Sequence, residues 1–365
     1  MKHKPKILIV HKDPRANNPN ACHVGLGVTA NNEAKVLKKH GIDAEATVVV
    51  DGYDLKHGLH IDKWGKVSHV VMCAPFFDTP FLTKLCLCFP EIQFSVCFHS
   101  NAGFLGVDKW AMGILGEQIE RQRVLKNFKV ATNSKKFSKV VEQSFGVSVQ
   151  TLPNLYWLES DELYIRPTKK ERKKGEVLKV GTFCAIRTLK NIPTAAFAAA
   201  ILSRKLDVPV EFVIMKGREE DPAAEKIIEG IKRLYCHLPN VKLVEEPWRE
   251  WEQFKMEVVH KMDILLQPSF TESFNNVTAD GISVGVASVV GEAIDWVPVE
   301  WTANVDDAND MAEVAIRLLE DKQAPFNGFL SLVDHNKDAI DWWKLWMHNN
   351  STFGKLIKMW EKVWK

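Results

Sequence analysis

Short apolar runs alternate with helix-like segments along most of the chain. In the first half, the runs predicted as strands cover residues 6–10, 44–50, 69–73, 94–98, 129–132 and 148–152. After a break, the alternation resumes with runs at 177–183, 210–215, 241–244, 264–266 and 287–290. Strands that alternate with helices form parallel sheets covered on both faces. The pattern therefore predicts an α/β protein with two doubly wound, Rossmann-like domains.

The break between the two series is a dense run of basic side chains, RPTKKERKKGE, at residues 166–176. Such a run is typical of a solvated linker, and the alternative is a contact surface for an anion. We therefore expect domains at 1–165 and 177–345 and a terminal helix over 346–365. Phe353, Ile357, Trp360 and Trp364 share one face of that helix, which either packs on the protein or docks on a membrane between flanking lysines.

Composition narrows the class of protein only slightly. The 365 residues carry 48 basic and 46 acidic side chains, a net charge of +2, and no apolar run of bilayer length. The seven cysteines are odd in number, and several fall in apolar runs, which favours a reduced, cytoplasmic protein. The chain has no CxxC, HExxH, Walker-type or Asp-x-Asp motif, so we predict no metal site.

Residues 263–292 are organised as strand, polar turn, helix and strand. Ile264 to Leu266 forms the first strand, and the helix begins near Asn275. Glu272 lies in the turn and Asp280 eight positions later in the helix. In a βαβ unit the ligand binds beyond the carboxyl end of the strand. Both carboxylates are therefore expected to face one crevice.

A second set of candidate residues follows the strand at 177–183. Arg187 and Lys190 lie in a strand-to-helix loop, where cations beside a helix N-terminus favour a phosphate site. We predict that they hold a diphosphate and that the helix start at Asn275, Asn276 and Val277 adds backbone donors. Asp280 would accept ribose hydroxyls and Glu272 the hydroxyls of a transferred group, and this arrangement requires no metal.

A glycine pair precedes the first long helix. Gly25-Leu-Gly27-Val-Thr-Ala30 matches a dinucleotide loop, and Asp51 ends the next strand, as in a nicotinamide enzyme. However, about fourteen residues separate Gly25 from the first strand, whereas the fingerprint requires a tight turn. We therefore expect a glycine-rich loop entering a helix whose N–H groups face an anion or a sugar.

These motifs together resemble those of GT-B-fold retaining glycosyltransferases, above all glycosyltransferase family 4. The matching residues are Pro268-Ser269…Glu272-x-Phe274 with Asp280, and Arg187…Lys190-Asn191. The resemblance implies an acceptor-binding first domain, a nucleotide-sugar donor site in the second, and a C-terminal helix that packs on the first domain. It also implies that His99, at the end of a strand, faces the sugar. Two departures are Asp280 in the second acidic position and Asn275 where the family has glycine, and we expect donor preference to depend on them.

The predicted function is a retaining glycosyltransferase that moves a sugar from a nucleotide diphosphate, with a UDP-sugar favoured, to an acceptor hydroxyl. No permanently bound cofactor is expected. The acceptor stays open among a saccharide, a small metabolite and a hydroxymethylated pyrimidine in DNA. Basic residues at Lys135, Lys136, Lys139 and 166–174 keep the DNA alternative open. From another class, a nucleotide-sugar-binding module without turnover is the alternative.

Overall fold

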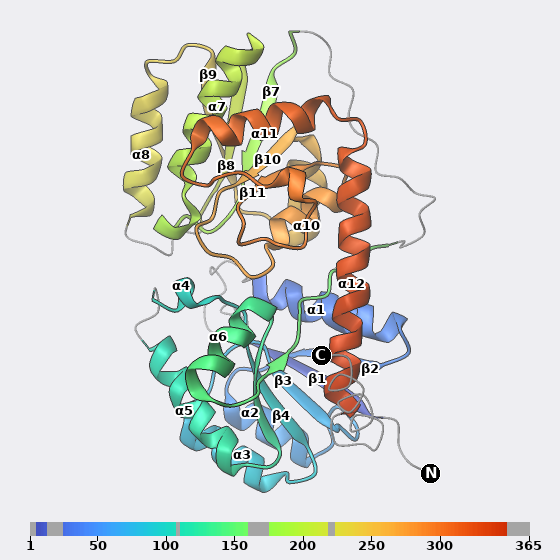
Figure 1. Cartoon of the computed structure of the whole chain (residues 1–365). Coiled ribbons are helices and arrows are strands. Elements are labelled where there is room, and N and C mark those ends of the chain that lie inside the picture. Colours follow the sequence, from blue (N-terminus) through green and yellow to red (C-terminus); the bar gives the residue numbers. More distant parts are fainter. Residues whose placement is uncertain (1–4, 13–24, 107–109, 160–174, 218–222, 349–365) are drawn as a thin grey trace. The chain divides into compact units, whose positions relative to one another are not determined.

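The computed structural model describes residues 5–12, 25–106, 110–159, 175–217 and 223–348. The chain divides into two compact units. Unit 1 comprises Met1–Trp157 and His335–Lys365, and unit 2 comprises Leu158–Asp334. Each unit contains one parallel sheet with helices (Figure 1). The predicted pair of α/β domains is therefore confirmed.

Unit 1 is built on a six-stranded sheet with the order β2-β1-β3-β4-β5-β6, in which every neighbouring pair is parallel. The order places the switch point between β1 and β3, because the chain continues in opposite directions from these two neighbours. Its elements are β1 (Lys6–His11), α1 (Gly25–Lys39), β2 (Asp43–Val48), α2 (Gly52–His60), β3 (His69–Met72), α3 (Thr79–Cys88), β4 (Gln93–Phe98), α4 (Ala102–Leu105), α5 (Ala111–Val124), β5 (Phe128–Thr132), α6 (Lys135–Phe145) and β6 (Gln150–Thr151).

Both faces of this sheet are apolar and covered. Along β1, Leu8 and Val10 belong to one hydrophobic cluster with residues of α2, α3, α5 and α6. Ile7 and Ile9 belong to a second cluster, with residues of α1 and of α12 (Ala324–His348). Successive side chains of a strand point to opposite faces, so a strand covered on both sides is an unbroken apolar run. This explains why the first strand was readable from its sequence.

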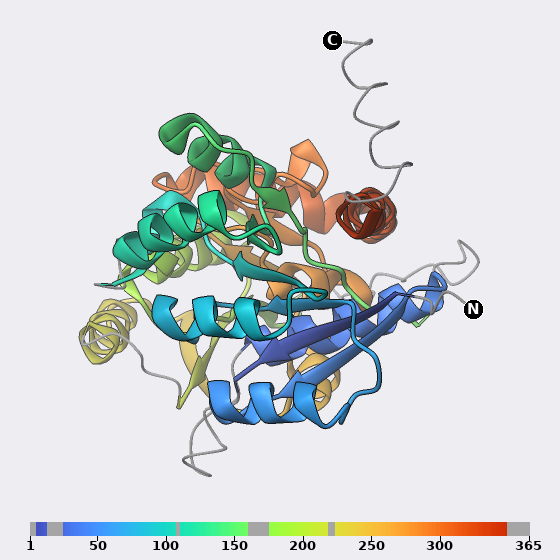
Figure 2. The ribbon, with the colours of Figure 1, turned by 90° about the horizontal axis from the view of Figure 1, so that it is seen from below.

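The second half of α12 belongs to unit 1, and it is seen end-on in Figure 2 as the dark red coil. Trp343 is buried and donates its indole N–H to the backbone oxygen of Pro153 at 3.0 Å, and Trp346 is buried beside it. Asn336 exchanges two hydrogen bonds with the backbone of Tyr156. The prediction that a C-terminal helix packs on the first domain is confirmed by α12. The predicted helical face from Phe353 to Trp364 lies outside the described residues.

Unit 2 contains a five-stranded parallel sheet with the order β11-β10-β7-β8-β9. In the part of the chain that the structure describes, no helix is long and apolar enough to cross a membrane. The elements of unit 2 are β7 (Leu178–Thr182), η2 (Thr188–Lys190), α7 (Ile192–Leu206), β8 (Val210–Lys216), α8 (Ala224–Tyr235), β9 (Val241–Pro247), α9 (Trp251–Gln253), η3 (Phe254–Val258), η4 (Val259–Lys261), β10 (Ile264–Gln267), α10 (Asn276–Ser283), β11 (Ser288–Val290), η5 (Val299–Trp301), α11 (Ala308–Glu320) and the start of α12.

The strand order of unit 2 creates a switch point between β7 and β10. From β7 the chain proceeds to β8 and β9 on one side, and later to β10 and β11 on the other. The strands β10 and β7 pair at Ile264 with Val180 and at Leu265 with Gly181. Thr182 donates its hydroxyl to the backbone oxygen of Leu266 at 3.0 Å. Ligands of open α/β sheets bind beyond the carboxyl ends of the strands at such a point.

Candidate functional site

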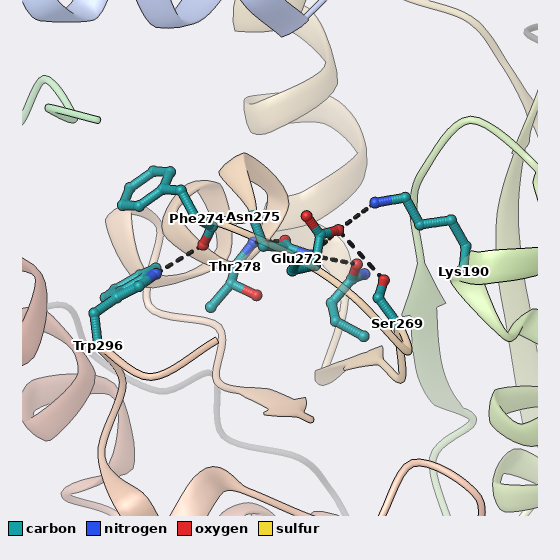
Figure 3. A network of polar contacts seen from close by, with 8 residues as sticks. Lys190, Ser269, Glu272, Phe274, Asn275, Thr278 and Trp296 are labelled. Carbon is teal, nitrogen blue, oxygen red and sulfur yellow. Dashed lines mark hydrogen bonds and ion pairs between the residues drawn. The ribbon is translucent and has the colours of Figure 1, made fainter. Parts of the chain in front are cut away.

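Lys190 and Glu272 meet at the switch point of unit 2. Lys190 follows β7, Glu272 follows β10, and the ammonium of Lys190 donates to Oε1 of Glu272 (Figure 3). The side chains are only 15% and 13% exposed, so this ion pair is shielded from water. Ser269 also donates to Oε1 of Glu272, at 3.3 Å. The structure therefore brings together two predicted site residues that lie 82 positions apart in the sequence.

Asn275 links Glu272 to the start of α10. Its backbone has φ 66° and ψ 87°, a left-handed conformation that favours glycine and, next, asparagine. Its side-chain oxygen accepts the backbone N–H of Thr278 at 2.9 Å and caps the helix. Its amide nitrogen donates to Glu272 Oε1 and to Gln267 Oε1, each at 3.3 Å. The N–H of Thr278 is thus already used by the cap, and Asn276 and Val277, the first two residues of α10, stay the predicted backbone donors to an anion.

An aromatic pair fixes the turn before this helix. The rings of Phe274 and Trp296 stack with centroids 5.0 Å apart and an interplanar angle of 19°. The indole N–H of Trp296 donates to the backbone oxygen of Phe274 at 2.7 Å. Phe274 is buried, and its contacts with Trp296 order the backbone just before α10.

Asp280 lies in α10, about one helical turn after its first residue, Asn276. Its side chain is buried, and only 2% of the residue's surface is exposed. Its Oδ1 accepts the indole N–H of Trp251 at 2.8 Å. The ammonium of Lys255 lies 4.5 Å from the centroid of the Trp251 ring. The predicted ribose acceptor is therefore held by a tryptophan from the segment that follows β9.

Arg187 lies in the loop after β7 and directly precedes the short helix η2. A backbone hydrogen bond connects this loop to the loop after β10. Phe270 donates its N–H to the oxygen of Leu189 at 3.0 Å, which places the Glu272 turn beside the residue preceding Lys190. Asn191 adopts a left-handed conformation, with φ 50°, and donates to the backbone oxygen of Val305 at 2.6 Å. These contacts order the loop that carries both predicted cations.

Gly25 and Gly27 belong to unit 1 and lie inside the first turn of α1, not in a loop before it as predicted. A Cβ atom at Gly27 would lie 3.1 Å from Cε1 of His11, the last residue of β1. Glycine at this position therefore lets the helix approach the imidazole closely. The dinucleotide fingerprint is not formed, because residues 12–24 separate β1 from α1.

His99 also belongs to unit 1 and follows β4, as predicted. Removal of the imidazole from water lowers its pKa to about 4, against a smaller opposing effect of a hydrogen bond with Asn154. Nδ1 of His99 lies 3.4 Å from the amide nitrogen of Asn133, which in turn donates to Asn154 at 2.8 Å. His99 is therefore neutral at pH 7.

Four contacts of unit 2 were missed by sequence reasoning: Ser269 and Asn275 on Glu272, Trp251 on Asp280, and Trp296 on Phe274. Only the two contacts on Glu272 involve residues that the sequence marks as notable. Ser269 belongs to the Pro-Ser motif, and Asn275 stands where the motif has glycine. Trp251 and Trp296 come from other segments of the chain, and only folding brings them to Asp280 and Phe274.

In the described ranges, no group of three His, Cys, Asp or Glu side chains could hold a metal ion.

Comparisons with known proteins find neither a matching family model nor a matching curated protein. Solved structures do match. An α,α-trehalose-phosphate synthase (UDP-forming) from Burkholderia xenovorans matches with a TM-score of 0.63 and 12% identity, over 94% of this chain and 99% of the other. Anabaena HepE, solved in complex with UDP, matches with a TM-score of 0.58 and 12% identity, over 92% and 94%.

A third solved structure, S. aureus TarM in complex with UDP, matches with a TM-score of 0.54 and 14% identity. The match covers 80% of this chain but spans only 57% of that protein. At these identities the likeness concerns the fold. The two parallel sheets and the helix that returns to unit 1 agree with it. The chain has the GT-B fold of the glycosyltransferases that it matches.

Proposed function

We propose that this protein is a retaining glycosyltransferase that takes a sugar from a nucleotide-diphosphate sugar. The observation that supports this most is the meeting of Lys190 and Glu272 beyond β7 and β10, at the switch point of unit 2. A cation there suits a diphosphate, and a carboxylate suits sugar hydroxyls. The fold match to proteins solved with UDP and UDP-glucose favours UDP as the nucleotide.

In this proposal Arg187 and Lys190 bind the diphosphate, and the N-terminal residues of α10 add backbone N–H donors. Asp280 accepts a hydroxyl of the ribose while Trp251 holds its carboxylate in place. Glu272 binds hydroxyls of the transferred sugar. In unit 1, His99 contributes a neutral imidazole that donates or accepts a hydrogen bond at pH 7 but carries no charge.

The test is a thermal-shift screen of nucleotide sugars, followed by a transfer assay on the donor that raises the melting temperature most. The Glu272→Ala, Arg187→Ala and Lys190→Ala variants are each expected to lose transfer while keeping the fold. Lys205→Ala is the control, because Lys205 forms a more exposed ion pair with Glu313 at the end of α7 that is further from Lys190 along the chain. Full activity of Lys190→Ala would refute the site.

A donor-hydrolysis assay separates the enzyme from a binding module without turnover. Water can replace the acceptor in a transferase, so slow release of UDP from the bound donor is expected from the wild-type protein. Tight donor binding with no release of UDP, with or without acceptors, would favour the module instead.

A further inference from the structure

In the structure, Lys190, one of the two candidate phosphate-binding cations of unit 2, is already paired. Lys190 donates to Glu272 in surroundings that leave both side chains mostly out of water. At this exposure, the interaction between the two charges is weakly screened. An incoming diphosphate therefore meets an ammonium whose charge is balanced by a carboxylate, and that carboxylate repels the ligand.

Glu272 does not depend on Lys190 alone. Its Oε1 also accepts from the hydroxyl of Ser269 and the amide of Asn275, each at 3.3 Å (Figure 3). Both donors are neutral, and both side chains are buried. If the ammonium turned toward a phosphate, the carboxylate would keep two hydrogen bonds. A buried carboxylate left without donors would cost far more.

Asn275 is the more informative of the two donors. A left-handed residue at this turn could be glycine, which adopts this conformation without strain. Asparagine adds a side chain whose oxygen is fixed on the N–H of Thr278 and whose nitrogen contacts Gln267 and Glu272. The cap sets the orientation of the amide, so the N–H that reaches Glu272 is held in place before any ligand binds.

We propose that Glu272 is the internal counter-ion of Lys190, and that Asn275 is a positioning residue that, with Ser269, holds Glu272 when Lys190 transfers to a diphosphate. The identity of that diphosphate as part of a sugar donor rests on the proposed function, whereas the exchange of the ion pair does not. In this scheme donor binding releases Glu272 from Lys190 and makes the carboxylate available to the sugar.

The first test measures pyrophosphate binding by isothermal titration calorimetry at low salt. Glu272→Gln keeps the shape of the side chain and removes the opposing charge, so pyrophosphate is expected to bind about five- to tenfold more tightly than to wild type. Glu313→Gln, which removes the charge from the Lys205 pair, is the control and is expected to change nothing. Equal affinities of wild type and Glu272→Gln, or no binding to either, would overturn the proposal.

The second test isolates Asn275. Asn275→Gly keeps the left-handed turn and removes the amide, so Glu272 depends more on Lys190, and pyrophosphate is expected to bind about threefold more weakly. In the Glu272→Gln background the same substitution is expected to have no effect, because the charge that Asn275 holds is gone. An equal loss in both backgrounds would mean that Asn275 acts only as a helix cap, and would overturn its positioning role.

The two tests also separate this inference from the proposed function. If pyrophosphate behaves as expected while no nucleotide sugar binds, the ion-pair exchange stands and the glycosyltransferase proposal fails. If a nucleotide sugar binds and is turned over while Glu272→Gln leaves pyrophosphate affinity unchanged, the function stands and the exchange is refuted.

Discussion

The hydrogen bond between Trp251 and Asp280 is expected to stabilise the helix that carries the second acidic residue. Trp251→Phe removes the indole N–H but keeps an aromatic face for the ammonium of Lys255. A hydrogen bond to a charged acceptor contributes about 1.5–3 kcal/mol, and its loss from a buried carboxylate adds a desolvation cost. Asp280 has further interactions that share this cost, so we expect about 2 kcal/mol.

Hydrogen exchange of the α10 amides is the suitable assay, because a protein of two units need not unfold in one step. A loss of 2 kcal/mol corresponds to about a thirtyfold faster exchange where α10 opens locally. Asp280→Asn keeps an oxygen for the indole but removes the charge, so its α10 exchange shows how much of the stabilisation depends on a charged acceptor. Exchange of α10 in Trp251→Phe within twofold of wild type would refute this account of the contact.

The Asp280→Asn variant also tests the ribose assignment. If Asp280 binds the ribose, Asp280→Asn weakens UDP binding about tenfold but leaves pyrophosphate binding unchanged, because pyrophosphate has no ribose. Equal weakening of both ligands would show that Asp280 acts through the shape of α10 and not through the nucleoside.

Two further predictions concern stability. Burial raises the pKa of Glu33 well above its ordinary value of 4.5, so above that pH the unfolded chain is ionised while the folded one keeps its proton. Glu33 therefore contributes a loss of stability as pH rises, by up to about 1.4 kcal/mol per pH unit, and the difference in pH dependence between wild type and Glu33→Gln isolates this contribution. Melting temperatures at pH 5 and pH 8 measure it, and an unchanged slope in the variant would contradict the assignment. Gly281→Ala should destabilise the protein by about 1–3 kcal/mol, because its Cβ would lie 2.7 Å from Leu265 Cδ1 and 2.9 Å from the oxygen of Val286. Gly116→Ala, also in a helix but with no atom within 4 Å of the added Cβ, should stabilise it by about 0.5–1 kcal/mol, and denaturant unfolding that ranks the two variants the other way would refute the packing argument.

The strands and helices were largely readable because parallel sheets covered on both faces need continuous apolar runs. The run at 264–266 became β10, and the turn and helix after it lie where the pattern placed them. Asn275 was recognised as an unusual residue at a glycine position, which a motif can reveal. Its role could not be read, because the left-handed backbone and the three side-chain contacts depend on where Thr278, Gln267 and Glu272 lie in space.

The sequence by itself determined the α/β class, the two series of strands and the candidate side chains at strand ends, since these depend on local periodicity and turn residues. Only the tertiary structure decided that β10 pairs with β7, which brings Lys190 to Glu272. It also placed Trp251 on Asp280, and Trp343 and Trp346 of α12 in the core of unit 1. The physical reason is that periodicity specifies which face of an element is buried, whereas pairing between distant strands depends on the packing of the whole unit.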